Sequence, residues 1–180
     1  MGTMTGTADR DLVGIVASAA AGDHIAFGRI VGAYHDDMCR VCTFVTGDTE
    51  LAEDAVQSAW SIAWQKLGSL REPDRLRAWL MRVAVNEAKR LLEKRSRRSQ
   101  LEVTIDASRV SGSIDPATGI DSLDMIAAVG RLAPEDRGLL AMRYIAGFDS
   151  NELAAAIGLS SSGIRTRIER VLARLRQELE

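Results

Sequence analysis

The stretch GLSSSGIRTRIERVLARLR, from Gly158 to Arg176, places three serines directly before a helical pattern that carries five arginines. Apolar residues recur there at three- and four-residue steps, which predicts an amphipathic helix beginning near Ser161. Gly158 predicts a turn, and Ser160 can cap the first free amide groups of the helix. The whole chain of 180 residues has a formal net charge of −2. This helix holds five of the 23 Lys and Arg residues, so positive charge is concentrated on it although the chain is slightly acidic.

The segment before this helix adds a second signal. In DSNELAAAIG, Asp149 is followed three residues later by Glu152, the spacing of a capping box at a helix start. Two short helices joined by a glycine-containing turn are typical of a helix-turn-helix, whose second helix enters the major groove of DNA. A helical hairpin with a merely solvated basic face is the alternative. Arginines on the second helix favour DNA, because they attract the phosphate backbone.

A second basic cluster lies at residues 82–98, RVAVNEAKRLLEKRSRR, with seven basic residues against two acidic ones, a local charge of +5. Two basic surfaces far apart in the sequence suit a long anionic ligand such as DNA. Joining two weak contacts in one chain raises the effective concentration of each for the other.

The chain is predicted to be all-α, with two helical domains joined by a flexible linker and a helix-turn-helix in the second domain. Helical apolar patterns fill residues 9–98, which we assign to the first domain. Residues 99–121 are rich in Ser, Gly and Asp and have no helical period, as in a linker. Helical patterns resume over 122–180, the second domain.

An acidic and amide-bearing face is predicted on the helix near residues 50–67, on the side opposite Val56 and Trp60. The residues of this face are Asp54, Gln57, Ser58 and Ser61. A face of this kind suggests a protein partner. The alternative is acid that only complements the positive end of a helix dipole.

Two cysteines, Cys39 and Cys42, form a C-x-x-C pair one turn after His35. A metal or redox site stays open, but the pair lies in a helical apolar repeat, and free cysteines most often act as small buried hydrophobes. We find no P-loop, nucleophile elbow or complete metal set, so we predict no enzyme, catalytic residue, metal or cofactor. No stretch approaches the about 20 apolar residues that span a bilayer, and no signal pattern begins the chain. We therefore expect a cytoplasmic protein without membrane insertion.

Three stretches in this order resemble the bacterial extracytoplasmic-function (ECF) sigma factors of RNA polymerase, in the compact form that has only sigma domains 2 and 4. Residues 21–67 are similar to regions 2.1 and 2.2, residues 76–98 to regions 2.3 and 2.4, and residues 132–179 to region 4. The resemblance implies a transcription initiation factor that binds core RNA polymerase and directs it to promoters through their −10 and −35 elements.

The resemblance also implies roles for residues. The D-x-x-Q face, here Asp54 and Gln57 with the neighbouring Ser58 and Ser61, would dock on the β′ clamp helices, and the β flap would be a second polymerase contact. The −10 element would be bound by Arg75, Asn86, Lys89, Arg90, Arg97 and Arg98. The −35 element would be bound by Ser161, Ser162, Arg165, Thr166, Arg167 and Arg170. An anti-sigma factor is the remaining partner that the resemblance implies.

Two other functions compete with this interpretation. A conventional helix-turn-helix regulator would usually carry a ligand-binding or dimerisation domain and act on a palindrome. A helical adaptor that binds only proteins would explain the acidic face, but it would leave both basic surfaces without a ligand.

Overall fold

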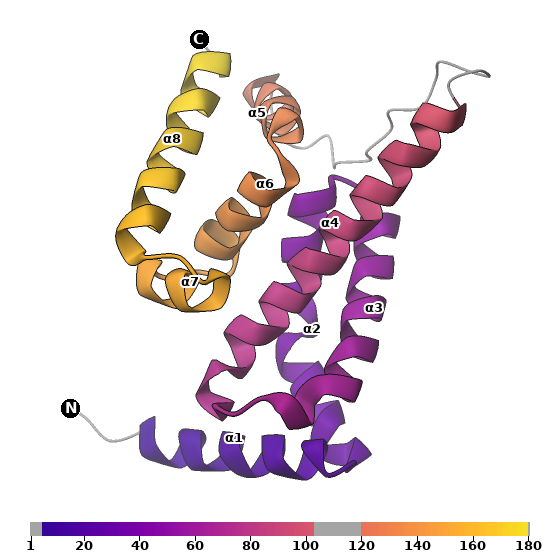
Figure 1. Cartoon of the computed structure of the whole chain (residues 1–180), viewed down its shortest axis with the longest axis vertical. Coiled ribbons are helices and arrows are strands. Elements are labelled where there is room, and N and C mark those ends of the chain that lie inside the picture. Colours follow the sequence, from indigo (N-terminus) through magenta and orange to yellow (C-terminus); the bar gives the residue numbers. More distant parts are fainter. Residues whose placement is uncertain (1–4, 103–119, 180) are drawn as a thin grey trace.

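The computed structural model describes residues 5–102 and 120–179, with side chains described over 11–98 and 124–179. Over those ranges every regular element is helical, which confirms the all-α prediction. Four helices form an N-terminal domain and four more form a C-terminal domain beside it (Figure 1). None of the helices described in either domain is long and apolar enough to cross a membrane.

The N-terminal domain is a helical bundle closed at one end by its first helix. Its helices are α1 (Thr5–Ala20), α2 (His24–Thr46), α3 (Thr49–Lys66) and α4 (Leu76–Glu102). Two short 3₁₀ turns, Leu67–Ser69 and Pro73–Arg75, lead from α3 to α4. The apolar stripes of α2, α3 and α4 meet in a core where Met38, Val56 and Leu80 are at most 1% exposed. In Figure 1, α1 crosses the end of this bundle.

The start of α3 is held by one carboxylate with two functions. Asp48 caps the helix by accepting a hydrogen bond from the Leu51 amide at 3.0 Å. Its other oxygen pairs with Arg95 of α4 at 2.5 Å, so the cap also ties α3 to α4. The backbone hydrogen bond and the arginine both favour the charged form and lower the pKa of Asp48 below its ordinary value.

Asp48→Ala is expected to lower the free energy of unfolding by about 1–2 kcal/mol at neutral pH, because the cap and the link to α4 are lost together. Since the pKa of Asp48 is lowered by folding, its contribution is complete above the ordinary value of 3.8 and disappears as the pH falls through the lowered value. Urea unfolding at about pH 7 and about pH 3 checks this. The control is Asp36→Ala, which removes one exposed carboxylate from α2. An equal loss in both variants would refute the capping argument.

The C-terminal domain contains the predicted helix-turn-helix. Its elements are α5 (Ile120–Arg131), α6 (Pro134–Leu140), a π-helical turn (Ala141–Ile145), α7 (Ser150–Ile157) and α8 (Ser161–Leu179). The capping box between Asp149 and Glu152 is present, and Gly158 ends α7 in the left-handed conformation with φ 81°. Ser160 accepts from the Gly163 amide at 3.1 Å and so caps α8. These local predictions from the sequence are confirmed.

The ends of the predicted linker are helical. α4 continues to Glu102 and α5 begins at Ile120. The rest of the range 99–121 lies outside the described residues.

The two domains share one hydrophobic core, which the sequence does not predict. Leu139, Met142 and Phe148 of the C-terminal domain are buried in the same cluster as the core residues of α2 and α4. α6 packs tightly on α4 at Gly138, where a Cβ would lie only 2.6 Å from Cγ1 of Val85. Glycine is therefore what allows α6 to lie against α4 at this distance.

Arg77 of α4 adds a polar link between the domains. Its guanidinium donates a hydrogen bond to the carbonyl oxygen of Ala146 and lies 4.4 Å from the ring centroid of Phe148. Asp37 of α2 lies 3.8 Å from the same guanidinium.

Candidate functional site

α8 presents one continuous row of exposed side chains. Ile164, Ile168, Val171 and Leu175 are buried, and the opposite row follows the spacing i, i+3, i+4, i+7. Its members are Ser162, Arg165, Thr166 and Glu169, all exposed. Homeodomain recognition helices present their base-contacting side chains at the same spacing. Arg170 is also exposed and lies beside this row. The row has the geometry needed to enter a major groove.

The start of α8 is fixed by its hydroxyl groups. The Ser161 hydroxyl donates to the Asn151 side-chain oxygen at 2.6 Å, which links the two helices of the motif. The Ser160 and Ser162 hydroxyl oxygens lie 3.2 Å apart. The Ser161 hydroxyl, predicted as a DNA contact, therefore donates its hydrogen bond within the motif and helps to position α8. Asn151 was missed, because nothing in the sequence spacing pairs a residue of the first helix with the start of the second.

Arg167 points away from the exposed row. Its guanidinium pairs with Asp136 of α6 at 2.8 Å, and its side chain lines the cavity between the domains. In this arrangement it holds α8 against α6. The other five predicted −35 residues lie at the start of α8 or on its exposed side.

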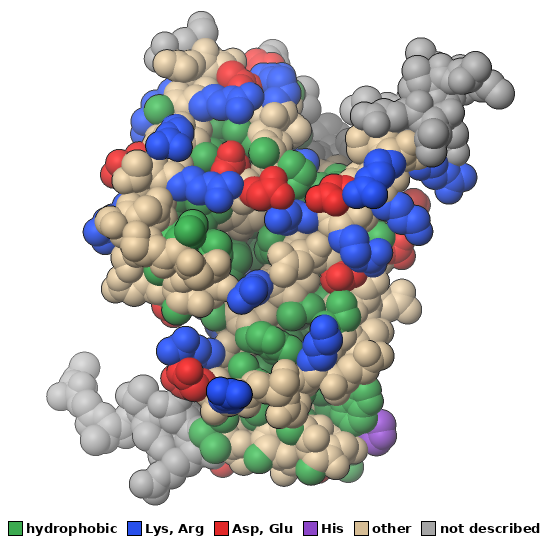
Figure 2. Space-filling model, in the orientation of Figure 1, with side chains coloured by type: hydrophobic (Ala, Val, Ile, Leu, Met, Phe, Trp, Pro, Cys, Tyr) green, Lys and Arg blue, Asp and Glu red, His purple; other side chains and the backbone are tan. Residues whose placement is uncertain are grey.

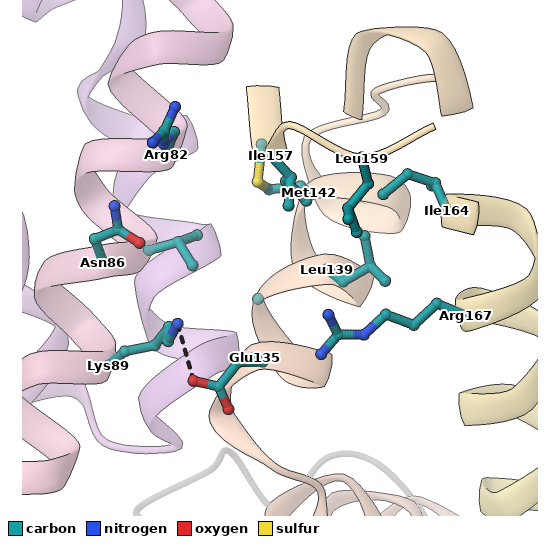
Figure 3. A pocket seen from close by; sticks show the side chains of 12 residues that line it. Arg82, Asn86, Lys89, Glu135, Leu139, Met142, Ile157, Leu159, Ile164 and Arg167 are labelled. Atoms are coloured by element: carbon teal, nitrogen blue, oxygen red, sulfur yellow. Dashed lines mark ion pairs between the residues drawn. The ribbon is translucent and has the colours of Figure 1, made fainter. Parts of the chain in front are cut away.

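Two of the predicted −10 residues face the C-terminal domain. Asn86 and Lys89 line a cavity of about 210 Å³ between α4 and the α6–α8 segment, and Lys89 pairs with Glu135 at 2.9 Å (Figure 3). The lysine lowers the pKa of Glu135 by favouring its charged form. Arg82 lines the same cavity and was not among the predicted contacts. The cavity is far too small to admit a DNA strand. Lys89 is half-buried and engaged by Glu135 there, whereas Asn86 and Arg82 remain exposed.

The remaining predicted −10 residues lie on exposed surface. Arg75 pairs with Glu72 at 2.7 Å, Arg90 with Glu87 at 2.7 Å and Arg97 with Glu93 at 3.3 Å. The pairs of Arg75 and Arg97 are exposed and lie within a single turn, so they hold these arginines weakly. Glu87 is largely buried and accepts from two nitrogen atoms of Arg90. Arg98, also exposed, lies one residue further along α4. On the face drawn in Figure 2, basic side chains lie over α4 and over the α8 side, with acidic ones between them.

The predicted docking face on α3 is partly as expected. Asp54, Gln57 and Ser61 are exposed and Ser58 is half-buried. The expectation that Trp60 lies opposite is wrong, because Gln57, Ser61 and Trp60 line one shallow groove between α2 and α3. Trp60 is only half-buried, so it is not simply part of the core. The apolar stripe of α3 is wide enough that its edge borders the polar face.

The groove also contains the residues that surround the C-x-x-C pair. Trp60 donates its ring N–H to Nδ1 of His35 at 3.2 Å, and Nε2 of His35 lies 3.5 Å from Sγ of Cys39. Cys42 is fully buried, and burial raises the pKa of its thiol to about 12. Cys42 is therefore a small core residue, as favoured from the sequence. Over the described residues no group of three or more His, Cys, Asp or Glu side chains is placed to hold a metal ion.

Two family models match this chain, and between them they cover the two basic surfaces on α4 and α8. The family model for sigma-70 region 2 matches residues 30–98, and that for sigma-70 region 4 matches residues 122–175. The first match covers α3 and most of α4, and the second covers the helix-turn-helix. Both occur in the order expected from the sequence.

Individual relatives agree with these matches. The chain is 29% identical over 168 residues to the probable RNA polymerase sigma factor RfaY of Xanthomonas campestris pv. campestris, and 30% identical over 171 residues to the ECF sigma factor BldN of Streptomyces coelicolor. Each alignment covers 89% of this chain, but the chain spans only 42% of RfaY and 64% of BldN.

A solved structure of CnrH in complex with the cytosolic domain of CnrY has the same fold. Its TM-score is 0.67 at 26% identity, over 92% of this chain and 94% of that one. CnrH of Cupriavidus metallidurans is itself named an RNA polymerase sigma factor. The chain thus belongs to the sigma-70 family of RNA polymerase sigma factors, in the extracytoplasmic-function group.

Proposed function

We propose that this chain is an alternative sigma factor, which binds core RNA polymerase and directs it to promoters that carry particular −10 and −35 elements. The observation that carries the proposal is the exposed row on α8, which lies on a basic helix-turn-helix within the match to sigma-70 region 4. The basic α4, in the separate match to region 2, supplies the second DNA contact that such a factor needs. The proposal requires no cofactor and no catalytic residue.

The proposed division of work follows the two domains. The face made of Asp54, Gln57, Ser58 and Ser61 would bind the β′ clamp helices, and the C-terminal domain would reach the β flap. α8 would read the −35 element as duplex DNA. The start of α4 and the loop before it would hold an unstacked base of the −10 element. Extruding that base costs a few kcal/mol, which contacts in a pocket offset.

The arrangement of the two domains engages one of the proposed −10 contacts, so we expect the domains to separate when the promoter is bound. Asn86 and Lys89 lie in the cavity between the domains, and Lys89 is paired with Glu135 there. Asn86 is exposed, but Lys89 becomes available to promoter DNA only when its pair with Glu135 breaks, which separation of α6 from α4 would achieve. Arg167 would stay paired with Asp136 after separation, because both residues belong to the C-terminal domain.

A protein inhibitor is the remaining proposed partner. CnrH, whose fold this chain shares, was solved with the cytosolic domain of CnrY bound. We expect an anti-sigma factor to act on this chain as well, by holding the domains in an arrangement that polymerase and promoter cannot use.

Run-off transcription with bacterial core polymerase and a pooled promoter library tests the proposal. Transcripts that depend on the added protein and share two spaced upstream elements would support it. Stable binding to polymerase without any transcript would favour a helical adaptor. Binding to a palindrome without polymerase would favour a conventional helix-turn-helix regulator.

Alanine variants of Arg165 and Arg176 distinguish specific base recognition from nonspecific attraction to the phosphate backbone. Both are exposed on α8, but only Arg165 lies on the exposed row near the helix start. Arg165→Ala is expected to weaken binding to the specific promoter about 10- to 100-fold, whereas Arg176→Ala should reduce binding to all sequences slightly. Titrations at several salt concentrations on specific and random DNA measure the difference. Equal losses on both DNAs would mean that the two arginines act only by charge.

A further inference from the structure

Glu169 is an acidic side chain on the one face of α8 that has the geometry to meet bases. It is exposed, it ends the row that begins at Ser162, and Arg165 lies one turn before it on the helix surface. We propose that Glu169 selects a cytosine in the −35 element by accepting a hydrogen bond from the N4 amino group of the base. This inference rests on the proposed function and assigns a base preference to it.

The first step concerns the position of Glu169 along the helix. Ser162 and Glu169 are seven residues apart, which corresponds to about 10 Å of helix rise. Base pairs stack at about 3.4 Å, so the row spans about three base pairs. Glu169 therefore reaches a base at the far end of the same short site that Ser162 and Arg165 face.

The second step concerns intramolecular partners. α7 and α8 carry three described carboxylates, and two of them are already used. Glu152 completes the capping box by accepting from the Asp149 amide at 2.7 Å, and Glu178 pairs with Arg131 at 2.8 Å. Within the described part of the chain, Glu169 has neither an ion pair nor a side-chain hydrogen bond of this kind. Its carboxylate is free to meet a ligand.

The third step concerns the chemistry of the groove. A carboxylate only accepts hydrogen bonds, and phosphate repels it. It therefore binds favourably to a base edge only where that edge offers a hydrogen-bond donor. Guanine offers two acceptors in the major groove, and thymine offers an acceptor and a methyl group. Adenine places its N7 acceptor beside its amino group, which repels the second carboxylate oxygen. Cytosine offers its N4 amino group without an acceptor beside it, and is the base that a carboxylate matches best.

The experiment uses the full chain with core polymerase and a promoter library in which the −35 element is randomised. We expect the unaltered protein to prefer cytosine at one position by about 10- to 100-fold. Glu169→Gln should move that preference to adenine, because an amide binds adenine N6 and N7 together. Glu169→Ala should remove the preference, and neither variant should change the preferred bases elsewhere. Gln and Glu have nearly equal helix propensity, so α8 should fold equally well in the glutamine variant.

Asp124→Asn is the matched control, because it removes one exposed carboxylate from α5, outside the row. If Glu169→Gln keeps the same preferred base at every position and merely binds all sequences more tightly, Glu169 acts by charge alone and the inference is wrong. If the unaltered protein selects no upstream element at all, the proposed function fails instead. The two failures are therefore distinguishable within one experiment.

Discussion

Replacing Gly138 with alanine should push the two domains apart. The new Cβ would lie 2.6 Å from Cγ1 of Val85, well inside van der Waals contact, and a β-branched side chain in a helix has little freedom to move away. Overpacking of this kind costs about 1–3 kcal/mol. Alanine is also the better helix former, by about 1 kcal/mol, so α6 itself should gain stability. The loss therefore falls on the interface between the domains, where it should reduce the closed form about 5- to 150-fold relative to the open form.

Small-angle scattering and a fluorophore pair, with one dye on each domain, measure the separation. Gly138→Ala should give a larger radius of gyration and a longer distance between the dyes. Adding Val85→Ala removes the clashing Cγ atoms and should restore the closed form. Gly130→Ala is the control, since a Cβ on that glycine of α5 meets nothing within 4 Å. If Gly138→Ala behaves like Gly130→Ala, the interface adjusts without opening, and the close approach does not govern it.

Removing the polar side chains of the α3 face together should weaken binding to core polymerase. Asp54→Ala with Gln57→Ala deletes two exposed side chains at the centre of the proposed docking face. The few residues whose truncation costs more than about 1 kcal/mol cluster near the centre of an interface, so we expect the loss of both side chains to lower the affinity about tenfold. The helical content should not change, because alanine is the best helix former.

A matched double variant separates docking from net charge. Glu50→Ala with Gln65→Ala removes one carboxylate and one amide from exposed positions near the two ends of the same helix. Fluorescence anisotropy of the labelled protein, titrated with core polymerase, compares the two variants. Equal affinity of the Asp54 and Gln57 variant and the unaltered protein would remove this face from the polymerase interface.

The sequence predicts the elements of this fold well where the cause is local. Gly47 ends α2 in the left-handed conformation, and Asp149 with Glu152 forms the capping box, because both depend on residues within one turn. The exposed row of α8 is also readable, since a buried stripe at helical spacing defines the opposite side. These features need no knowledge of the neighbouring domain.

Contacts between distant segments could not be predicted in the same way. Lys89 meets Glu135, and Arg167 meets Asp136, only because α6 lies against α4 on one side and α8 on the other. An apolar stripe shows that a helix is covered, but it does not identify the helix that covers it. From the sequence alone, a glycine in a helical pattern indicates only a lower helix propensity at that position. Only its distance from Val85 shows that Gly138 leaves no room for a side chain between α6 and α4.

The ion pair between Asp48 and Arg95 bears on how the distance between promoter elements would be recognised. It ties the start of α3 to the second half of α4, and both helices are already fixed by one buried core. The helix proposed to face polymerase and the helix proposed to face the −10 element therefore move as one body. Under the proposed function, the distance between the polymerase contact and the −10 contact would then be fixed within this domain. Under the same proposal, differences in spacer length between promoters would be accommodated by the position of the C-terminal domain.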